Sequence, residues 1–161
     1  MKELTLETRI KVCTPEELAE KDRQLVTEAI NATFHSYAPY SNFSVGAAAR
    51  LTNDIIVTGS NQENAAYPSG LCAERTTLFY ANSQYPDQAV TTLAIASRHA
   101  TSMQINDTIC PPCGACRQVM LETENRFNHP IKILLCGLTQ IYIVESAACL
   151  LPLSFGQELL K

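Results

Sequence analysis

The stretch SGLCAERTTLFY, from Ser69–Tyr80, places a thiol, a carboxylate and a guanidinium almost side by side at Cys72, Glu74 and Arg75. The pattern that follows predicts a helix over residues 72–82, with an apolar inner side. A buried thiol or charge is costly unless it is paired or ligated. The stretch therefore indicates that further polar or metal-binding groups meet the start of this helix.

A second stretch, CPPCGACRQVM, carries two overlapping C-x-x-C pairs, Cys110 with Cys113 and Cys113 with Cys116. Such a pair at a helix start can bind one metal ion, because the helix N-terminus favours thiolates. Alone, it could also be a redox pair or half of a structural zinc site. A catalytic zinc typically takes three protein ligands and keeps its fourth position for water. Cys72, which begins another helix, is a candidate for the third ligand.

Strand and helix patterns alternate along the rest of the chain, which is typical of a sheet covered on both faces. We expect a single domain over residues 1–161, of class α/β, folded as a three-layer α/β/α sandwich with a mixed five-stranded sheet. Leu78 and Phe79 should face inward from the 72–82 helix. The expected helices are 15–37, 72–82, 113–122 and a short one within 152–161, and the expected strands are 43–51, 55–60, 90–97, 131–136 and 140–144.

The composition fits one folded domain of 161 residues, with 46% hydrophobic and 17% charged residues. The net charge of -4 argues against a dedicated nucleic-acid binder. The N-terminal MKELTLETRIKV is charged throughout, and no apolar run approaches the length of a membrane span. Seven cysteines, an odd number, make a disulfide framework a poor interpretation. We therefore expect a cytoplasmic protein without membrane or nucleic-acid partners.

Several motifs together closely resemble the cytidine deaminase family. They are CAER (72–75), PCGACRQ (112–118), YSNFSVGAA (40–48), NQENAAY (61–67) and LLPLSF (150–155), which cover most of the chain. The last three are similar to the family's first-strand motif, its nucleoside-binding loop and its C-terminal aromatic segment. The resemblance implies zinc-dependent hydrolysis of cytidine and deoxycytidine to uridine and deoxyuridine plus ammonia, in pyrimidine salvage, by a small homotetrameric enzyme.

The resemblance also implies which cysteines bind the metal. The family's second motif is P-C-x-x-C, so one Zn²⁺ per subunit should be bound by Cys72, Cys113 and Cys116, with Cys110 as a spare thiol. Glu74 then corresponds to the glutamate of the zinc deaminases, which moves protons and does not bind the metal.

Other positions take their expected roles from the same resemblance. Asn61 and Glu63 should bind the ribose, because two residues apart in an extended loop can face the same way. Phe43 should pack against the base, and backbone groups around Ala73 should contact the cytosine.

The metal site and the subunit contacts have expected residues as well. Arg75 and Gln118 should support the thiolates, since a guanidinium can donate N–H bonds to sulfur. Tyr67 and Phe155 are candidates for contacts with a neighbouring subunit's site.

Two alternatives stay open at this point. A deaminase of blasticidin-type antibiotics would share the C-A-E and P-C-x-x-C motifs, although the Asn61 and Glu63 loop favours a simple nucleoside. Deaminases of nucleotides, tRNA or DNA usually carry the motif H-A-E. Because Cys72 stands in place of that histidine, these deaminases are disfavoured. A non-enzymatic protein would instead close a structural Cys₄ zinc site with Cys110 as the fourth ligand.

Overall fold

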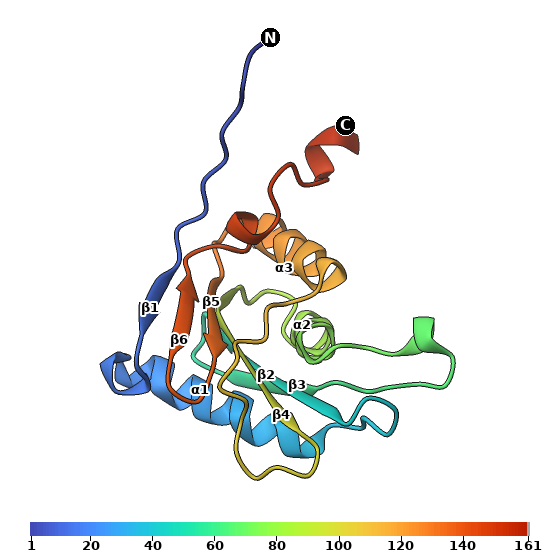
Figure 1. Ribbon diagram of the computed structural model, residues 1–161. Helices are drawn as coiled ribbons and strands as arrows, with labels where there is room; N and C mark the ends of the chain where they lie inside the picture. The colour runs from blue at the N-terminus through green and yellow to red at the C-terminus, as the bar shows by residue number, and fades with distance from the viewer. Residues whose placement is uncertain (161) are drawn as a thin grey trace.

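A six-stranded mixed sheet lies between helices on both of its faces in the computed structural model, which describes residues 1–160 (Figure 1). The sheet order is β1-β6-β5-β4-β2-β3, with β4 and β5 parallel and all other neighbours antiparallel. The strands are β1 (Lys11–Cys13), β2 (Phe43–Leu51), β3 (Ile56–Ser60), β4 (Val90–His99), β5 (Lys132–Cys136) and β6 (Ile141–Val144).

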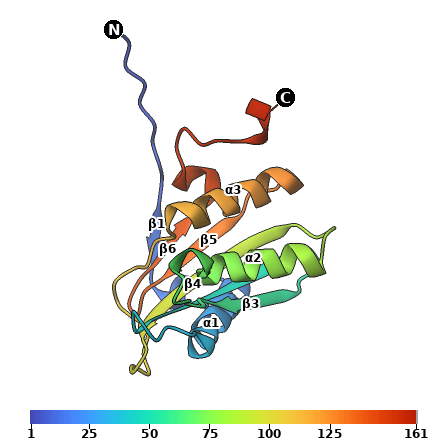
Figure 2. The same cartoon turned by 90° about the vertical axis from the view of Figure 1, so that its right-hand side faces the viewer.

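The helices divide between the two faces of the sheet. Helix α1 (Glu20–Ala32) covers one face, and α2 (Ala73–Gln84) and α3 (Gly114–Phe127) cover the other (Figures 1 and 2). The predicted α/β/α arrangement with a mixed sheet is thus confirmed. Short 3₁₀ turns complete the fold at Pro15–Glu17, Thr33–His35, Tyr67–Ser69, Ala147–Leu150 and Gln157–Leu160. Within residues 1–160, no helix combines the length and apolarity needed to cross a membrane.

The sheet has one strand more than the five predicted. The additional strand is β1, which pairs antiparallel with β6 over only three residues at the edge of the sheet. A run of three residues with a lysine is too short for a periodic signal, so pairing with β6 and not local sequence defines this strand.

The predicted helix over residues 15–37 was too long. Pro15–Glu17 forms a separate 3₁₀ turn, capped by Thr14 and Glu17 as a capping box. The chain is then extended at Leu18, whose side chain is buried, and α1 begins at Glu20. The buried, extended Leu18 therefore separates the 3₁₀ turn from α1.

Two further expectations differ from the structure. Phe79 is 48% exposed, while its neighbour Leu78 is fully buried, because adjacent helical residues point about 100° apart. The short helix expected within 152–161 is present as the 3₁₀ helix Gln157–Leu160 and not as an α-helix, and Lys161 lies outside the described residues.

Alternate residues of β2 build the two halves of the core. Ala47 and Ala49 face α2 and α3, whereas Ala48 packs with Leu25 and Ala29 on the α1 side. Gly46 lies where α1 crosses β2, and an added Cβ would clash with the backbone of α1. The small residues of β2 thus let α1 approach closely and fix the distance between the layers.

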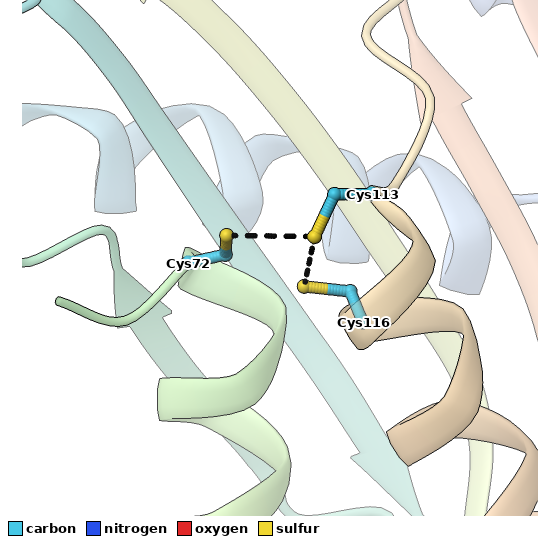
Figure 3. A group of neighbouring side chains, drawn as sticks. All are labelled: Cys72, Cys113 and Cys116. Carbon is cyan, nitrogen blue, oxygen red and sulfur yellow. Dashed lines mark hydrogen bonds between the residues drawn. The ribbon is translucent and has the colours of Figure 1, made fainter. Parts of the chain in front are cut away.

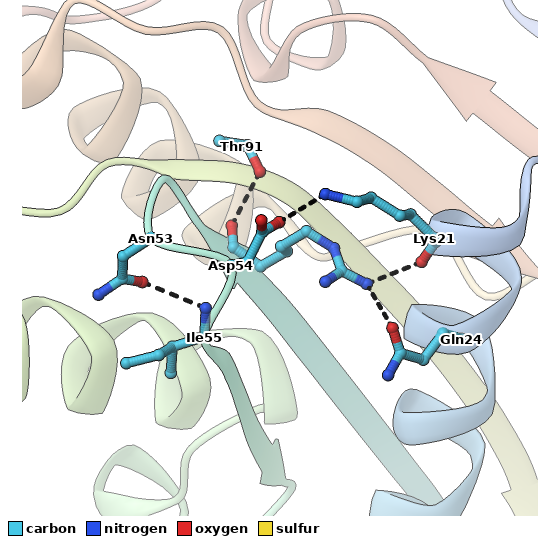
Figure 4. Close-up of polar contacts among 7 residues, drawn as sticks. Lys21, Gln24, Asn53, Asp54, Ile55 and Thr91 are labelled. Carbon is cyan, nitrogen blue, oxygen red and sulfur yellow. Dashed lines mark hydrogen bonds and ion pairs between the residues drawn. The ribbon is translucent and has the colours of Figure 1, made fainter.

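A polar cluster joins α1 to the β2–β3 hairpin at the far end of these strands (Figure 4). The buried Arg50 donates from Nη2 to the carbonyl of Lys21 at 2.8 Å and to Gln24 Oε1 at 3.2 Å. The Thr91 hydroxyl donates to the Arg50 carbonyl, and Lys21 pairs with Asp54 at 2.9 Å. These contacts hold the hairpin turn against the start of α1.

Candidate active site

The N-termini of α2 and α3 converge on a cluster of three cysteines (Figure 3). Cys72 is the N-cap of α2, Cys113 is the N-cap of α3, and Cys116 lies in the first turn of α3. Their sulfur atoms all lie within 4.8 Å of one another, with Cys72–Cys113 at 3.8 Å and Cys113–Cys116 at 3.4 Å. The structure therefore brings together the three cysteines that were predicted to bind zinc.

The donor chemistry of this cluster fits a zinc ion. Three sulfur ligands at two helix N-termini match a catalytic zinc that keeps its fourth position open. In residues 1–160, the group able to hold a metal consists of these three thiols and leaves Cys110 outside. Cys110 instead lines the neighbouring cavity, where burial raises the pKa of its thiol.

The cysteine cluster already favours a thiolate. A hydrogen bond from the Cys116 thiol and contact with the Arg75 guanidinium lower the pKa of Cys72 to about 5. The same contact with Cys72 raises the pKa of Cys116, which favours a protonated thiol there. Metal binding releases such protons because each ligand must be a thiolate.

Glu74 follows two residues after Cys72 and contributes to the same cavity wall as Cys72 and Cys113. Glu74 is buried, with only 4% of the residue exposed. Burial raises the pKa of this carboxyl, and the nearby charge of Cys72 adds to the effect. A carboxyl group with a raised pKa can both accept and donate a proton near neutral pH.

Arg75 lies on the cysteine side of α2. Its Nη2 is 3.8 Å from Cys72 Sγ, and its buried Nε has no hydrogen-bond partner among the described residues. Gln118, the other residue expected to support the thiolates, donates from Nε2 to the Phe155 carbonyl at 2.9 Å. The two residues therefore lie in different surroundings. Arg75 contacts the cysteine cluster, and Gln118 anchors the C-terminal segment.

A cavity of about 570 Å³ opens in front of Glu74 and the cysteines. Its wall includes four of the residues predicted to bind substrate or a neighbouring subunit, namely Phe43, Asn61, Glu63 and Tyr67. Ala73 is fully buried as the first residue of α2.

Glu63 presents an ionised carboxylate to this cavity. Its Oε2 accepts hydrogen bonds from the backbone N–H groups of Tyr40 at 2.8 Å and Ser41 at 3.3 Å. Hydrogen bonds from the Ser41 side chain and the Tyr40 N–H lower the pKa of Glu63. The Glu63 carboxylate therefore stands at the cavity wall, where it can accept a hydrogen bond from a ligand hydroxyl.

Asn61 is held by its own chain. Its Oδ1 accepts from the Ser36 hydroxyl at 2.6 Å and the Val45 N–H at 2.8 Å, and its Nδ2 donates to the Phe43 carbonyl at 2.8 Å. One hydrogen of Nδ2 is left over by these contacts. Asn61 therefore fixes the cavity wall to β2, a role that the sequence motif alone does not show.

The two aromatic residues expected to reach a neighbouring subunit are both exposed. Tyr67 is 77% exposed and packs edge-on against Tyr40, with ring centroids 6.2 Å apart, and Phe155 is 57% exposed. Tyr67 stands at the cavity wall. Phe155 lies in the C-terminal segment that Gln118 contacts.

Arg117 is a site residue to which the sequence reasoning gave no role. Its Nε donates to the Pro112 carbonyl and its Nη1 to the Leu150 carbonyl, each at 2.8 Å. These bonds tie the loop before Cys113 to the C-terminal segment. Its place directly after Cys116 in the PCGACRQ motif was the available signal.

Comparisons with known proteins agree with this site. The family profile described as "Cytidine and deoxycytidylate deaminase zinc-binding region" matches residues 19–127. A cytidine deaminase of Halalkalibacterium halodurans is 45% identical over 102 residues, 63% of this chain and 71% of that protein. One of Sporosarcina psychrophila is 36% identical over 137 residues, 84% of this chain and 91% of that protein.

Solved structures similar to this chain are cytidine deaminases as well. The crystal structure of cytidine deaminase from Burkholderia pseudomallei has a TM-score of 0.68 and 34% identity, covering 82% of this chain and 97% of its own. That from Mycobacterium tuberculosis has a TM-score of 0.64 and 32% identity, covering 83% and 95%. Because the matched profile spans both cysteine motifs and more than half of the chain, the chain belongs to the cytidine and deoxycytidylate deaminase zinc-binding family.

Proposed function

We propose that the chain is a zinc-dependent cytidine deaminase, which hydrolyses cytidine and deoxycytidine to uridine and deoxyuridine with release of ammonia. The observation that carries the proposal is a buried carboxyl, Glu74, beside a three-cysteine cluster at the wall of a cavity of about 570 Å³. Family membership and relatives named cytidine deaminases support it.

Cys72, Cys113 and Cys116 would hold one zinc ion. When bound at such a site, zinc activates water for attack on C4 of the cytosine ring. Glu74 takes a proton from the attacking water and donates it to N3 of the base. It then takes the remaining proton of that water from the new C4 hydroxyl and passes it to the amine, so that the C4–N bond breaks, C4=O forms and ammonia leaves. The raised pKa of Glu74 suits both steps, because the group must act first as a base and then as an acid.

Arg75 counters the negative charge of the cluster. Three thiolates around Zn²⁺ leave a net charge of -1, which would weaken the metal's attraction for electrons. The guanidinium beside Cys72 and the N-termini of α2 and α3 withdraw electron density from the sulfurs. Gln118 holds the C-terminal segment in place by donating to the Phe155 carbonyl.

The cavity wall would bind the nucleoside through hydroxyls and the base. The Glu63 carboxylate at the cavity wall accepts a hydrogen bond from the ribose 3′-hydroxyl, and the remaining Nδ2 hydrogen of Asn61 adds a donor. Phe43, which is 40% exposed at the cavity wall, packs against the base. Backbone groups around Ala73 contact the polar edge of the cytosine.

The assembly and setting complete the proposal. The chain acts as one domain over residues 1–161 in a homotetramer, in which the exposed Tyr67 and Phe155 contact neighbouring sites. It serves pyrimidine salvage in the cytoplasm. The seven cysteines are all free thiols, which fits a reducing compartment.

The test is to mix the purified, zinc-loaded protein with cytidine and follow the loss of ultraviolet absorbance as uridine forms. A Glu74→Gln variant is the control and should lose about 10²- to 10⁴-fold in kcat while keeping its zinc, because it removes the proton carrier alone. A native protein that holds zinc yet leaves both cytidine and deoxycytidine unchanged would overturn the proposal.

A further inference from the structure

Residues 1–10, here called the N-terminal arm, extend beyond the sandwich in both views of the molecule (Figures 1 and 2), and the Thr8 hydroxyl ties the arm to the C-terminal segment by donating to the Cys149 carbonyl at 2.7 Å. Every residue of the arm is exposed, and pairing with β6 begins at Lys11. The exposed side chains include apolar ones, with Leu4 77%, Leu6 52% and Ile10 44% exposed. Apolar side chains that gather on one exposed face can mark an interaction surface.

The arm has the alternating pattern of a strand that continues β1. Its even positions carry Leu4, Leu6 and Ile10 and lead to Val12 in β1, while its odd positions are mostly charged. This period of two is typical of a strand with one covered face. In the described part of the chain, β1 is an edge strand paired on one side, so its outer edge is open to another strand.

We propose that the arms of two copies of this chain pair antiparallel about a twofold axis at Thr8, which joins the two sheets edge to edge. In this register Leu4 lies opposite Val12 and Leu6 opposite Ile10 of the second copy. The apolar face is therefore apolar on both strands, and such cross-strand pairs are the unit of sheet stabilisation.

The charged face selects the same register. With the axis at Thr8, Glu7 lies opposite Arg9 of the second copy, and the symmetry repeats this pair. Moving the axis to residue 7 would place Glu7 opposite its own counterpart, and like charges directly opposite are destabilising. Moving it to residue 6 would place Leu4 opposite Thr8 and an aliphatic Ile10 opposite Lys2. Charge and hydrophobicity thus agree on one arrangement.

The arm lies outside the matched deaminase region, with Thr8 as its contact to the Cys149 carbonyl. The family profile begins at residue 19, after the arm and β1. The solved relatives are matched over 97% and 95% of their own chains but over only 82% and 83% of this one. Changes in the arm should therefore alter the contact between copies and leave cytidine turnover per active site unaffected.

Charge reversal tests the pairing in the full-length protein. Sedimentation velocity should compare the native chain with Glu7→Arg, Arg9→Glu and the double variant Glu7→Arg/Arg9→Glu. Each single change places like charges opposite each other twice, so the dissociation constant between copies should rise about tenfold. The double change restores opposite charges and should return native behaviour. Single variants that associate like the native chain, or a double variant as weak as the single ones, would overturn the proposal.

A disulfide tests the register directly. Thr8→Cys places two thiols opposite each other at the axis, whereas Thr5→Cys, the matched control, places its thiol opposite Lys11. After mild oxidation and digestion, mass spectrometry should find a peptide linked between the two substituted positions for Thr8→Cys alone. The absence of that link, or an equally strong link in the Thr5→Cys control, would overturn this register.

Discussion

Two cavities of similar size differ in how the charged groups beside them are paired. The cavity beside the cysteines measures about 570 Å³, and that between α1 and the β2–β3 hairpin about 530 Å³. In the second, Lys21 pairs with Asp54 at 2.9 Å and Lys132 with Asp22 at 2.6 Å. Arg50 there donates to a carbonyl and an amide oxygen.

Glu74 and Arg75, beside the first cavity, are not paired in this way within residues 1–160. Among the described residues, Glu74 is buried and forms no salt bridge, and Arg75 Nε is buried without an acceptor. Such groups cost free energy unless something completes them. Buried polar groups without partners, and not size, therefore distinguish the cavity proposed to bind the metal and the substrate from the second cavity.

The largest expected effect comes from the cysteine cluster. Cys116→Ser replaces a zinc ligand, so zinc content should fall at least about tenfold and activity should be lost with it. Cys110→Ser, the matched control in the same cavity wall, should keep both. Metal analysis and cytidine turnover measure the two effects.

The number of sulfur ligands at the zinc is a second test of the cysteine assignment. Zinc K-edge absorption of the native protein should report three sulfurs and one light atom. Four sulfurs, together with zinc loss in Cys110→Ser, would instead support a closed Cys₄ site and contradict the proposed assignment.

The sequence alone predicted the layers and the cysteine cluster because both depend on short-range signals. Periodicity located β2, β4 and the helices, and two short motifs located Cys72, Glu74, Cys113 and Cys116. Features that depend on distant contacts were beyond its reach.

The missed features show why. β1 exists through its pairing with β6. The side-chain hydrogen bonds of Asn61 depend on where β2 lies, and Gln118 reaches Phe155, which is far along the chain. Phe79 is exposed because the buried side of α2 is narrower than its hydrophobic residues suggest. Tertiary context determines each of these features.

A moderate effect is expected at the nucleoside end of the first cavity. Glu63→Gln removes the charge of the hydrogen-bond acceptor for the ribose, so KM should rise about tenfold with kcat nearly unchanged, because the hydroxyl is bound equally in the ground and transition states. Steady-state kinetics with cytidine measure both. A fall in kcat at constant KM would place Glu63 in the chemistry instead of in binding.

The smallest effect is expected at the exposed ion pair of the second cavity. A hydrogen bond from Lys21 lowers the pKa of Asp54 in the folded protein. The ionised carboxylate therefore stabilises the fold at pH values above the pKa of the unfolded chain, and this contribution is lost as the pH falls below about 3.8. Asp54→Asn should therefore flatten the acid limb of stability against pH. Urea unfolding between pH 3 and pH 6 measures the slope. An unchanged slope would show that the pair contributes nothing.

The most direct test of the contrast between the cavities compares one variant from each, Glu74→Gln and Arg50→Met, for turnover and for unfolding free energy. Glu74→Gln should lose about 10²- to 10⁴-fold in kcat and unfold no more easily than the native protein, because a costly buried carboxyl is removed. Arg50→Met should keep kcat and lose about 1–3 kcal/mol of stability, because its buried hydrogen bonds are broken. The reverse pattern, with Arg50→Met inactive but stable and Glu74→Gln active but destabilised, would contradict the account.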